Sequence, residues 1–177
     1  ILDQGHCITV NPSDPAQALI AFDATLHILG PSAQRDLKVE QFFINPTPER
    51  RALNQLDDDE LITGITIPTP PLDTHSVYLK MMDRQTWGFA LVSVAARITW
   101  DGERVARADI ILGGVAPTPY RASIAEQEVT GRTRSELHSG LADRAAHNAM
   151  RDAHPLEHNA YKAPLAAALI KRALLSV

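Results

Sequence analysis

The stretch Leu91-Val-Ser-Val-Ala-Ala-Arg-Ile-Thr-Trp100 decides the fold of this chain, because its apolar residues recur at every second position. Successive side chains of a β-strand point to opposite faces, so one face of this strand is apolar and the other is mixed. The apolar face carries Val92, Val94, Ala96, Ile98 and Trp100, and the other carries Ser93, Arg97 and Thr99. Asp101-Gly102 follows at once and is a strong hairpin signal. Val105 to Leu112 supplies the returning strand, so the pattern predicts an antiparallel sheet.

Another extended segment, Val77 to Met82, precedes this hairpin, and helical patterns follow it. The sequence predicts a short helix over Tyr120 to Val129. Thr133-Arg-Ser-Glu136 has the spacing of a capping box and predicts a second helix that continues to about Ala153. The last helix opens within residues 160–164 and carries apolar residues at helical spacing. Strands followed by helices, rather than strict alternation of the two, indicate an α+β fold.

The first part of the chain mixes one helix with short strands. Ser13-Asp14-Pro15 is typical of a helix start, and the apolar pattern after it predicts a helix that ends near Ala24. Thr25 to Leu29 and Asp36 to Val39 read as two strands joined by a turn. Leu61 to Ile67 predicts a third strand, in which isoleucines alternate with threonines near the end.

A proline-rich segment divides the chain. Gln41 to Asp58 is polar, and its only expected regular structure is one helical turn around Glu49 to Leu56. Pro68-Thr69-Pro70-Pro71 then interrupts the strand pattern, and proline-rich stretches are common between domains. We therefore expect one unit over residues 1–72 and a second over residues 75–177.

Composition excludes several classes of protein. The net charge is −4 and the basic residues are scattered, which argues against a nucleic-acid partner. No apolar run approaches the ~20 residues that cross a bilayer, so we expect a soluble chain without a membrane partner. Cys7 is the only cysteine, and one thiol cannot form an internal disulfide or hold an iron–sulfur cluster.

Three motifs in a fixed order carry a family resemblance. They are the stretch Ser76-Val-Tyr-Leu-Lys-Met-Met-Asp-Arg-Gln-Thr-Trp-Gly-Phe-Ala90, the turn Gly113-Gly-Val-Ala-Pro117 and the segment Asn159-Ala-Tyr-Lys-Ala-Pro164. Together they resemble the flavin subunit of the molybdenum hydroxylases, which include xanthine dehydrogenases, carbon monoxide dehydrogenases and bacterial aldehyde oxidoreductases. Cys7 to Ala24 is similar to the second flavin subdomain, especially in the aldehyde oxidoreductase branch, and Asp59 to Pro68 is similar to the strand that closes it.

The resemblance implies a fold and a role. The fold would be the remainder of the second FAD-binding subdomain, followed by a C-terminal domain with a small antiparallel sheet packed on a helical bundle. The complete subunit would relay electrons from iron–sulfur clusters through FAD to an external acceptor. Its partners would be an iron–sulfur subunit and a molybdopterin subunit of a complex that acts on aldehydes or aromatic heterocycles. The expected compartment is the cytoplasm, or the periplasm if a partner carries the export signal.

The resemblance also assigns cofactor-binding residues, but no catalytic residue and no metal ligand. Asp14 matches an aspartate at the ribityl or phosphate region of FAD, and Ser13 would cap the helix beside it. Lys80 matches a lysine that reaches the cofactor, and Ile62 matches an apolar residue near the flavin. Trp87 and Phe89, near the end of the Ser76–Ala90 stretch, would lie where the chain passes the isoalloxazine ring.

The chain departs from the family pattern at two points that affect how it would bind FAD. Gly88 stands where many relatives carry aspartate, so that side chain's hydrogen bond is missing. The glycine-rich segments that grip the pyrophosphate have no counterpart, so we expect the N-terminal half of the FAD domain to be missing. The chain would present one wall of a flavin site without the cradle, and by itself would bind FAD weakly or not at all. An alternative is a packing and interaction module of the same complex, without bound flavin.

Each of these residues also has a structural interpretation. Lys80 can be a solvated charge, Trp87 can fill the core, and Asp14 can act only in a helix cap. Arg84 can form a structural ion pair. His154-Pro-Leu-Glu-His158 matches the spacing of an inverted zinc-peptidase motif, but the family match makes it a loop.

Overall fold

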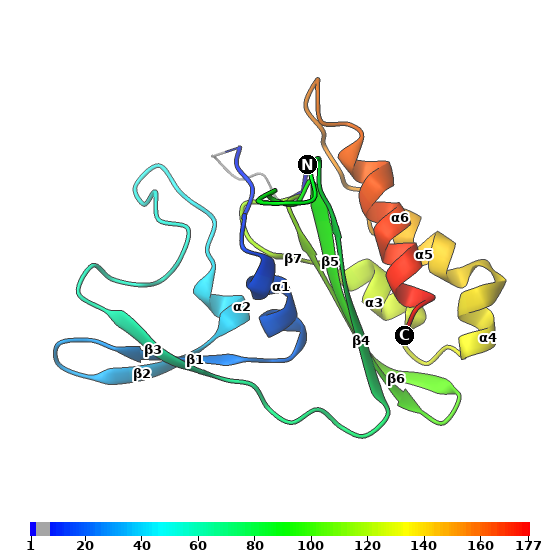
Figure 1. The fold of residues 1–177 in the computed structure, drawn as a ribbon, viewed down its shortest axis with the longest axis horizontal. Helices are drawn as coiled ribbons and strands as arrows, with labels where there is room; N and C mark the ends of the chain where they lie inside the picture. The colour runs from blue at the N-terminus through cyan, green and yellow to red at the C-terminus, as the bar shows by residue number, and fades with distance from the viewer. Residues whose placement is uncertain (3–7) are drawn as a thin grey trace.

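The computed structural model describes residues 1–2 and 8–177, so Cys7 lies outside the described residues. The elements form two antiparallel sheets with helices around them (Figure 1). The first part contains α1 (Asp14–Ala21), β1 (Thr25–Leu29), β2 (Gln34–Lys38), α2 (Val39–Phe42) and β3 (Leu61–Thr66), with strand order β2-β1-β3. The second part begins with β4 (Thr74–Met81), β5 (Val92–Asp101), β6 (Arg104–Gly113) and β7 (Tyr120–Arg121), in that order across the sheet. It ends with α3 (Ser123–Val129), α4 (Arg134–Glu136), the π-helical η1 (Leu137–Leu141), α5 (Ala142–Asn148) and α6 (Lys162–Leu174).

The four-stranded sheet confirms the expected hairpin and the α+β class. β5 and β6 pair antiparallel, with Val94 opposite Leu112 and Ala96 opposite Ile110. Gly102 takes a φ of 57° in the connecting turn, a conformation that glycine adopts without strain. The apolar face of β5 forms one core with α3, α5 and α6, which lie together on that side of the sheet in Figure 1.

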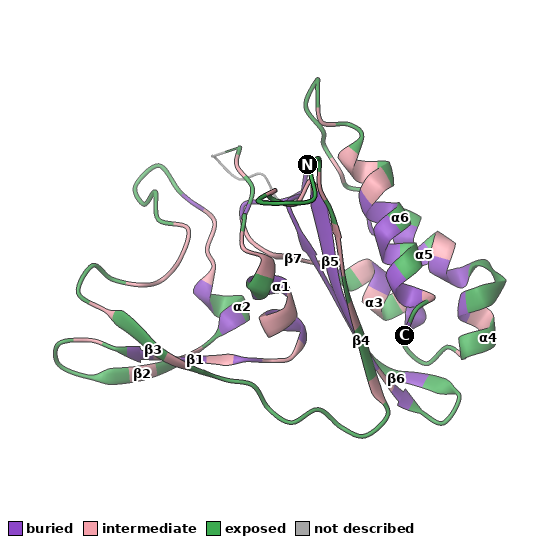
Figure 2. Ribbon diagram, viewed as in Figure 1, coloured by how far each residue is buried: buried purple, intermediate pink, exposed green. Residues whose placement is uncertain are grey.

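The opposite face of the same sheet is also buried. α1 packs on β5 and β6 from that side, and a second core joins Ala95 and Ile111 to Leu26 and Ile28 of β1. Figure 2 shows β5 and β6 buried along most of their length, whereas β3 is exposed or half-buried. The two parts of the chain therefore share this sheet.

Two helix predictions for the second part of the chain need correction, and one helix start is confirmed. Tyr120 and Arg121 form β7 rather than the start of a helix, because they pair with Leu112 and Ile111 at the edge of the sheet. The capping box of Thr133 and Glu136 is confirmed, since the Thr133 side chain accepts from the Glu136 amide and Glu136 accepts from Thr133. The helix does not continue to Ala153, because Gly140 has a φ of 108° and divides it, and α5 ends at Asn148.

In the first part of the chain, two helical segments also differ from the expectation. α1 ends at Ala21 rather than near Ala24, because Asp23 adopts a φ of 55° and the Ala24 amide donates to the Leu19 carbonyl. The helical turn expected around Glu49 to Leu56 is wrong: that region is irregular, and α2 forms the turn at Val39–Phe42 instead. None of the described helices has the length and apolar character needed to span a membrane.

A charge cluster fixes the first part against the sheet. Asp109 of β6 is buried, and its two oxygens accept hydrogen bonds from Arg97, Arg107 and Arg121 at 2.7–3.1 Å. Arg97 and Arg107 also contact Asp23, which lies just after α1, at 3.2 and 2.9 Å. Burial raises the pKa of Asp109, but the arginines outweigh it and leave that pKa below its usual value.

Candidate functional site

The start of α1 is shaped by its cap. The Ser13 hydroxyl accepts a hydrogen bond from the Ala16 amide at 3.3 Å, and Pro15 occupies the first turn. The Asn11 side chain accepts from the Ser13 amide at 3.0 Å and holds the incoming chain. Ser13 is thus the capping residue, which leaves the Asp14 carboxylate free to reach another element.

Asp14 connects the first part of the chain to the second. Its Oδ2 accepts from Lys80 Nζ at 2.6 Å, and its Oδ1 accepts from the Tyr78 hydroxyl at 3.0 Å. The Lys80 side chain is only 18% exposed, so it is not the fully solvated charge of the structural interpretation. Burial raises the pKa of Tyr78 to about 12; the Asp14 carboxylate adds to the rise and the Ser93 hydroxyl opposes it. The phenol therefore keeps its proton at neutral pH and remains a donor to Asp14.

Lys80 begins a row of residues in register across the sheet. Lys80 of β4 lies opposite Ser93 of β5, and Ser93 lies opposite Gly113 of β6. Asp14 and Gln17 are three residues apart on α1, so they share a face, and they lie over this row. Asp14 covers Lys80, while the Gln17 amide lies over Gly113.

The close packing around this row explains why glycine stands at positions 113 and 114. A Cβ on Gly113 would stand 2.3 Å from Gln17 Nε2 and 2.4 Å from Ser93 Oγ. Gly114 has a φ of 74°, and a Cβ there would stand 2.8 Å from the Leu91 carbonyl oxygen. Its own carbonyl accepts from Lys162 Nζ at 2.7 Å, which ties the turn to the Asn159–Pro164 motif.

A small cavity opens beside α1, enclosing about 70 Å³. Its lining comes from both parts of the chain: Val10, Asn11, Pro12, Ser13, Asp14, Gln17, Phe89, Ala90, Ser93 and Gly114. Gln17 is 1% exposed, yet neither its amide nitrogen nor its amide oxygen is hydrogen-bonded, and Ser93 Oγ makes no hydrogen bond of ordinary geometry. The cavity is therefore polar on one side and bounded by Phe89 on another.

The aromatic residues of the Ser76–Ala90 stretch lie on the surface. Trp87 is 92% exposed and Phe89 is 77% exposed, so the interpretation of Trp87 as a core residue is wrong. Arg84 donates to the Trp87 carbonyl at 2.9 Å, and no ion pair of Arg84 occurs among the described residues. A Cβ on Gly88 would stand 3.1 Å from the Arg84 carbonyl oxygen, so the aspartate of many relatives would need a local adjustment here.

Ile62 is not brought into this cluster. It lies on β3 in the three-stranded sheet, opposite Ile28, and does not line the cavity. It is 36% exposed, and β3 is an edge strand of that sheet. The structure thus gathers Ser13, Asp14, Lys80 and Phe89, places Trp87 in the adjoining loop, and leaves Ile62 apart.

The cavity fits one portion of a flavin cofactor and no more. Pockets that enclose a ligand of this size measure roughly 300–1,000 Å³, well above about 70 Å³. The unpartnered Gln17 and Ser93 atoms, the cation of Lys80 and the exposed aromatic rings nevertheless suit contact with a polar, planar ring. The cavity is therefore too small to enclose a whole flavin cofactor.

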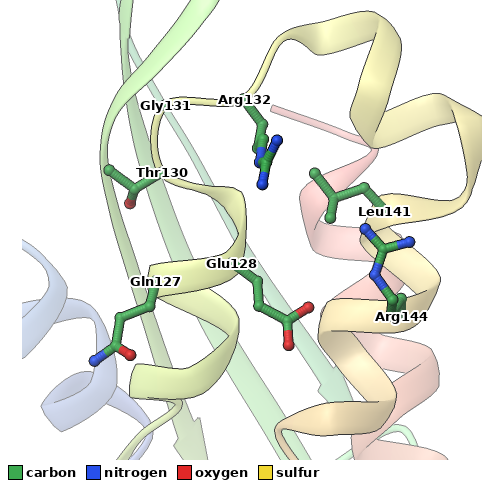
Figure 3. Close-up of a pocket in the computed structure, with 7 residues that line it drawn as sticks. All are labelled: Gln127, Glu128, Thr130, Gly131, Arg132, Leu141 and Arg144. Carbon is green, nitrogen blue, oxygen red and sulfur yellow. The ribbon is translucent and has the colours of Figure 1, made fainter.

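A larger hollow lies elsewhere, between α3 and α5 (Figure 3). It measures about 370 Å³, and its lining residues are Gln127, Glu128, Thr130, Gly131, Arg132, Leu141 and Arg144. Its charges are mixed: Arg132 pairs with Glu136 at 3.4 Å, and Glu128 faces the same space. None of the sequence-predicted site residues lies there, so volume alone does not identify the site.

The zinc-peptidase interpretation lacks the helix that it requires. Residues 153–156 are irregular and residues 157–160 form a turn, as the family match predicted. Among the residues that the structure describes, no group of three or more histidine, cysteine or acidic side chains is placed to hold a metal ion.

Sequence reasoning missed Gln17, Ser93 and the role of Tyr78. Gln17 stands three residues after Asp14 in a capped helix, which is a signal that could have been used. The Lys80–Ser93 pairing depends on strand register and is not readable from either segment alone.

Two family profiles match consecutive parts of the chain. Residues 5–70 match the FAD binding domain in molybdopterin dehydrogenase, and residues 77–177 match the CO dehydrogenase flavoprotein C-terminal domain. The second match alone covers more than half of the chain.

Named proteins and solved structures agree with these profiles. The aldehyde oxidoreductase FAD-binding subunit PaoB of Escherichia coli (strain K12) is 36% identical over 97% of this chain and 48% of its own length. The glyceraldehyde dehydrogenase medium chain of Sulfolobus acidocaldarius is 30% identical over 70% of this chain and 43% of its own. Carbon monoxide dehydrogenase from Hydrogenophaga pseudoflava superposes with a TM-score of 0.79 at 27% identity, covering 92% of this chain and 55% of that one. Quinoline 2-oxidoreductase from Pseudomonas putida 86, at 22% identity and a TM-score of 0.76, shows the fold alone.

This chain spans about half the length of the curated relatives that it matches. The profiles, the sequence identity and the arrangement of two sheets around α1 lead to the same assignment. The chain belongs to the family of FAD-binding medium subunits of the molybdenum hydroxylases.

Proposed function

We propose that this chain forms one wall of the FAD site in a molybdenum-dependent oxidoreductase complex. The complete subunit would relay electrons from iron–sulfur clusters through FAD to an external acceptor. The observation that carries the proposal is the contact of Asp14 with Lys80 and Tyr78, because it joins the two family-matched segments at the expected cofactor residues.

FAD would supply the electron-accepting and electron-donating chemistry of the subunit. Lys80 would place a positive charge beside the site, and its ion pair with Asp14 fixes the position of that charge. A fixed cation near a ring that gains negative charge on reduction favours the reduced form. Ser13 would act through α1, since its cap sets the direction in which Asp14 points.

The exposed aromatic residues would restrict water at the ring. Trp87 and Phe89 present large apolar surfaces to solvent, and such surface on a protein usually has a partner. Ile62 would pack against the cofactor from the separate three-stranded sheet. The surface between these elements would then be covered by FAD together with the other half of the FAD domain.

The family supplies the proposed partners. They are the iron–sulfur and molybdopterin subunits of a heteromeric complex, located in the cytoplasm, or in the periplasm when a partner carries the export signal. The proposed units are residues 1–72, which end just after the proline segment Pro68–Pro71, and residues 75–177; the limits of the two family matches support this division.

The test is the absorption spectrum of the complete subunit after gel filtration. A flavin band that co-elutes with the protein is expected. A folded, colourless subunit that takes up no FAD on titration would contradict the proposal.

A packing and interaction module without bound flavin is the second candidate. The small volume of the cavity favours it, because about 70 Å³ cannot enclose a dinucleotide. This candidate predicts that the subunit assembles with its partners at unchanged stoichiometry when no flavin is present, whereas the first predicts that electron transfer to an external acceptor needs FAD.

A further inference from the structure

The buried amide of Gln17 is the feature of this site that the fold does not explain. Gln17 is 1% exposed, and both of its polar side-chain atoms lack a hydrogen-bond partner. A buried polar group without a partner destabilises the fold, so such groups in native proteins usually meet a ligand or an ordered water. A leucine would fill the same volume without that cost.

The surroundings of Gln17 define what it can meet. Ser93 Oγ has only the Tyr78 hydroxyl as a polar neighbour, and both it and Gln17 Nε2 lie within 2.4 Å of the position that a Gly113 Cβ would take. The two polar groups are therefore neighbours on one wall of the cavity of about 70 Å³. Phe89 and Ala90 contribute to the rest of the lining, so the space has a polar end and an apolar side.

The chemistry of the amide restricts the ligand. A carboxamide presents a donor and an acceptor side by side, and its complement is another group with adjacent donor and acceptor atoms. The serine hydroxyl can donate or accept and so serves the next atom along that edge. A planar ring with an imide edge, in which an N–H stands between two carbonyls, meets this pattern and can lie against Phe89.

We infer that Gln17 and Ser93 bind the imide edge of the flavin's pyrimidine ring, and that Gln17 is the residue that recognises this edge. The inference rests on the proposed function and specifies which part of FAD this wall takes. The cavity is too small for the whole cofactor but has room for one polar edge of its ring.

The strand register adds support. Lys80 lies directly opposite Ser93, so its cation stands beside the same edge, where the ring carries its carbonyl oxygens. Gly113 leaves room for the Gln17 amide itself, because any side chain there would collide with that amide. Gln17 comes from α1 and Ser93 from β5, and these two elements pack against each other.

The experiment compares FAD with an FAD analogue methylated on the ring nitrogen of the imide. Apoprotein of the complete subunit is titrated with each, and binding is followed by quenching of flavin fluorescence. Wild-type protein is expected to bind FAD about tenfold more tightly than the methylated analogue, because the methyl group removes the donor and blocks the cavity. Gln17→Leu is expected to lower FAD affinity about tenfold and to reduce the discrimination to near onefold.

Gln127→Leu is the matched control, since Gln127 is an exposed glutamine that lines the other hollow. It should leave both affinities unchanged. Ser93→Ala provides a second variant and should weaken FAD binding by a smaller factor.

Each outcome is decisive. Equal binding of FAD and the methylated analogue by wild-type protein would overturn the inference and leave the proposed function intact. The same conclusion would follow if Gln17→Leu still preferred FAD over the analogue as strongly as the wild type does. Ordered water alone would then satisfy the amide. Absence of FAD binding by the wild-type subunit would instead overturn the proposed function, and the inference with it.

Discussion

Replacing Asp109 by asparagine should destabilise the chain more than any change at its surface. Asp109 is buried, and its oxygens accept five hydrogen bonds from Arg97, Arg107 and Arg121. Asparagine keeps the shape but removes the charge, and turns half of the group into a donor that faces guanidinium groups. Arg97, whose side chain is 4% exposed, would lose its 2.7 Å ion pair with Asp109 and keep the longer 3.2 Å ion pair with Asp23.

The magnitude follows from the loss of one partner of a buried ion pair, which costs about 3–5 kcal/mol. A typical domain has a total stability of about 5–15 kcal/mol, so the variant would lose a large share of it. Urea unfolding of the complete subunit, followed by circular dichroism, measures the change as a shift of the midpoint at constant slope.

The control is Asp101→Asn, which changes an exposed aspartate at the end of β5. It should change the free energy of unfolding by less than about 0.5 kcal/mol. A loss below about 1 kcal/mol in Asp109→Asn would refute the reasoning, because it would mean that the arginines find equivalent partners elsewhere.

Three further outcomes are expected. Ser13→Ala should lower stability by about 1 kcal/mol in urea unfolding, because it removes the cap of α1; the effect belongs to Ser13, not to Asp14, whose carboxylate is committed to Lys80 and Tyr78. Lys80→Ala should reduce the flavin retained by the complete subunit after gel filtration, and an unchanged flavin content with an unchanged reduction potential would remove Lys80 from the site. The arginines hold the pKa of Asp109 below its usual value, so its stabilisation is complete above the unfolded pKa of about 3.9 and is lost as the pH falls through the folded pKa. Urea midpoints measured from pH 6 down to pH 3 should therefore decline less steeply in Asp109→Asn than in the wild type.

Local patterns in the sequence were enough to predict the strands and the capped helix starts. The alternation from Val92 to Trp100 gave β5 correctly, and the Thr133–Glu136 capping box formed as expected. The helix predictions that were wrong concern residues whose conformation depends on tertiary contacts or on a local break. Tyr120 joined a sheet edge because β6 offered it free backbone groups, and Gly140 broke a helix whose apolar pattern continued on both sides.

From the sequence, candidate site residues could be named only where a family motif pointed to them. Lys80 and Asp14 came from motifs 66 residues apart, and only folding brings them to 2.6 Å. The spacing of Gln17 from Asp14 indicated a shared helix face, but an unsatisfied amide is a property of its surroundings and could not be read from the sequence. Ile62 shows the converse: the motif placed it near the others, yet the chain alone leaves it in a separate sheet.

The four-stranded sheet, covered on both sides, has a consequence for how such a gene can be divided. A break at the proline segment would release a C-terminal product whose Ala95 and Ile111 lose their covering, and whose buried Asp109 cluster faces water. An N-terminal product would carry α1 and three short strands with nothing beneath them. Each product would therefore expose surface that is buried in the intact chain, although a separate domain profile matches each stretch.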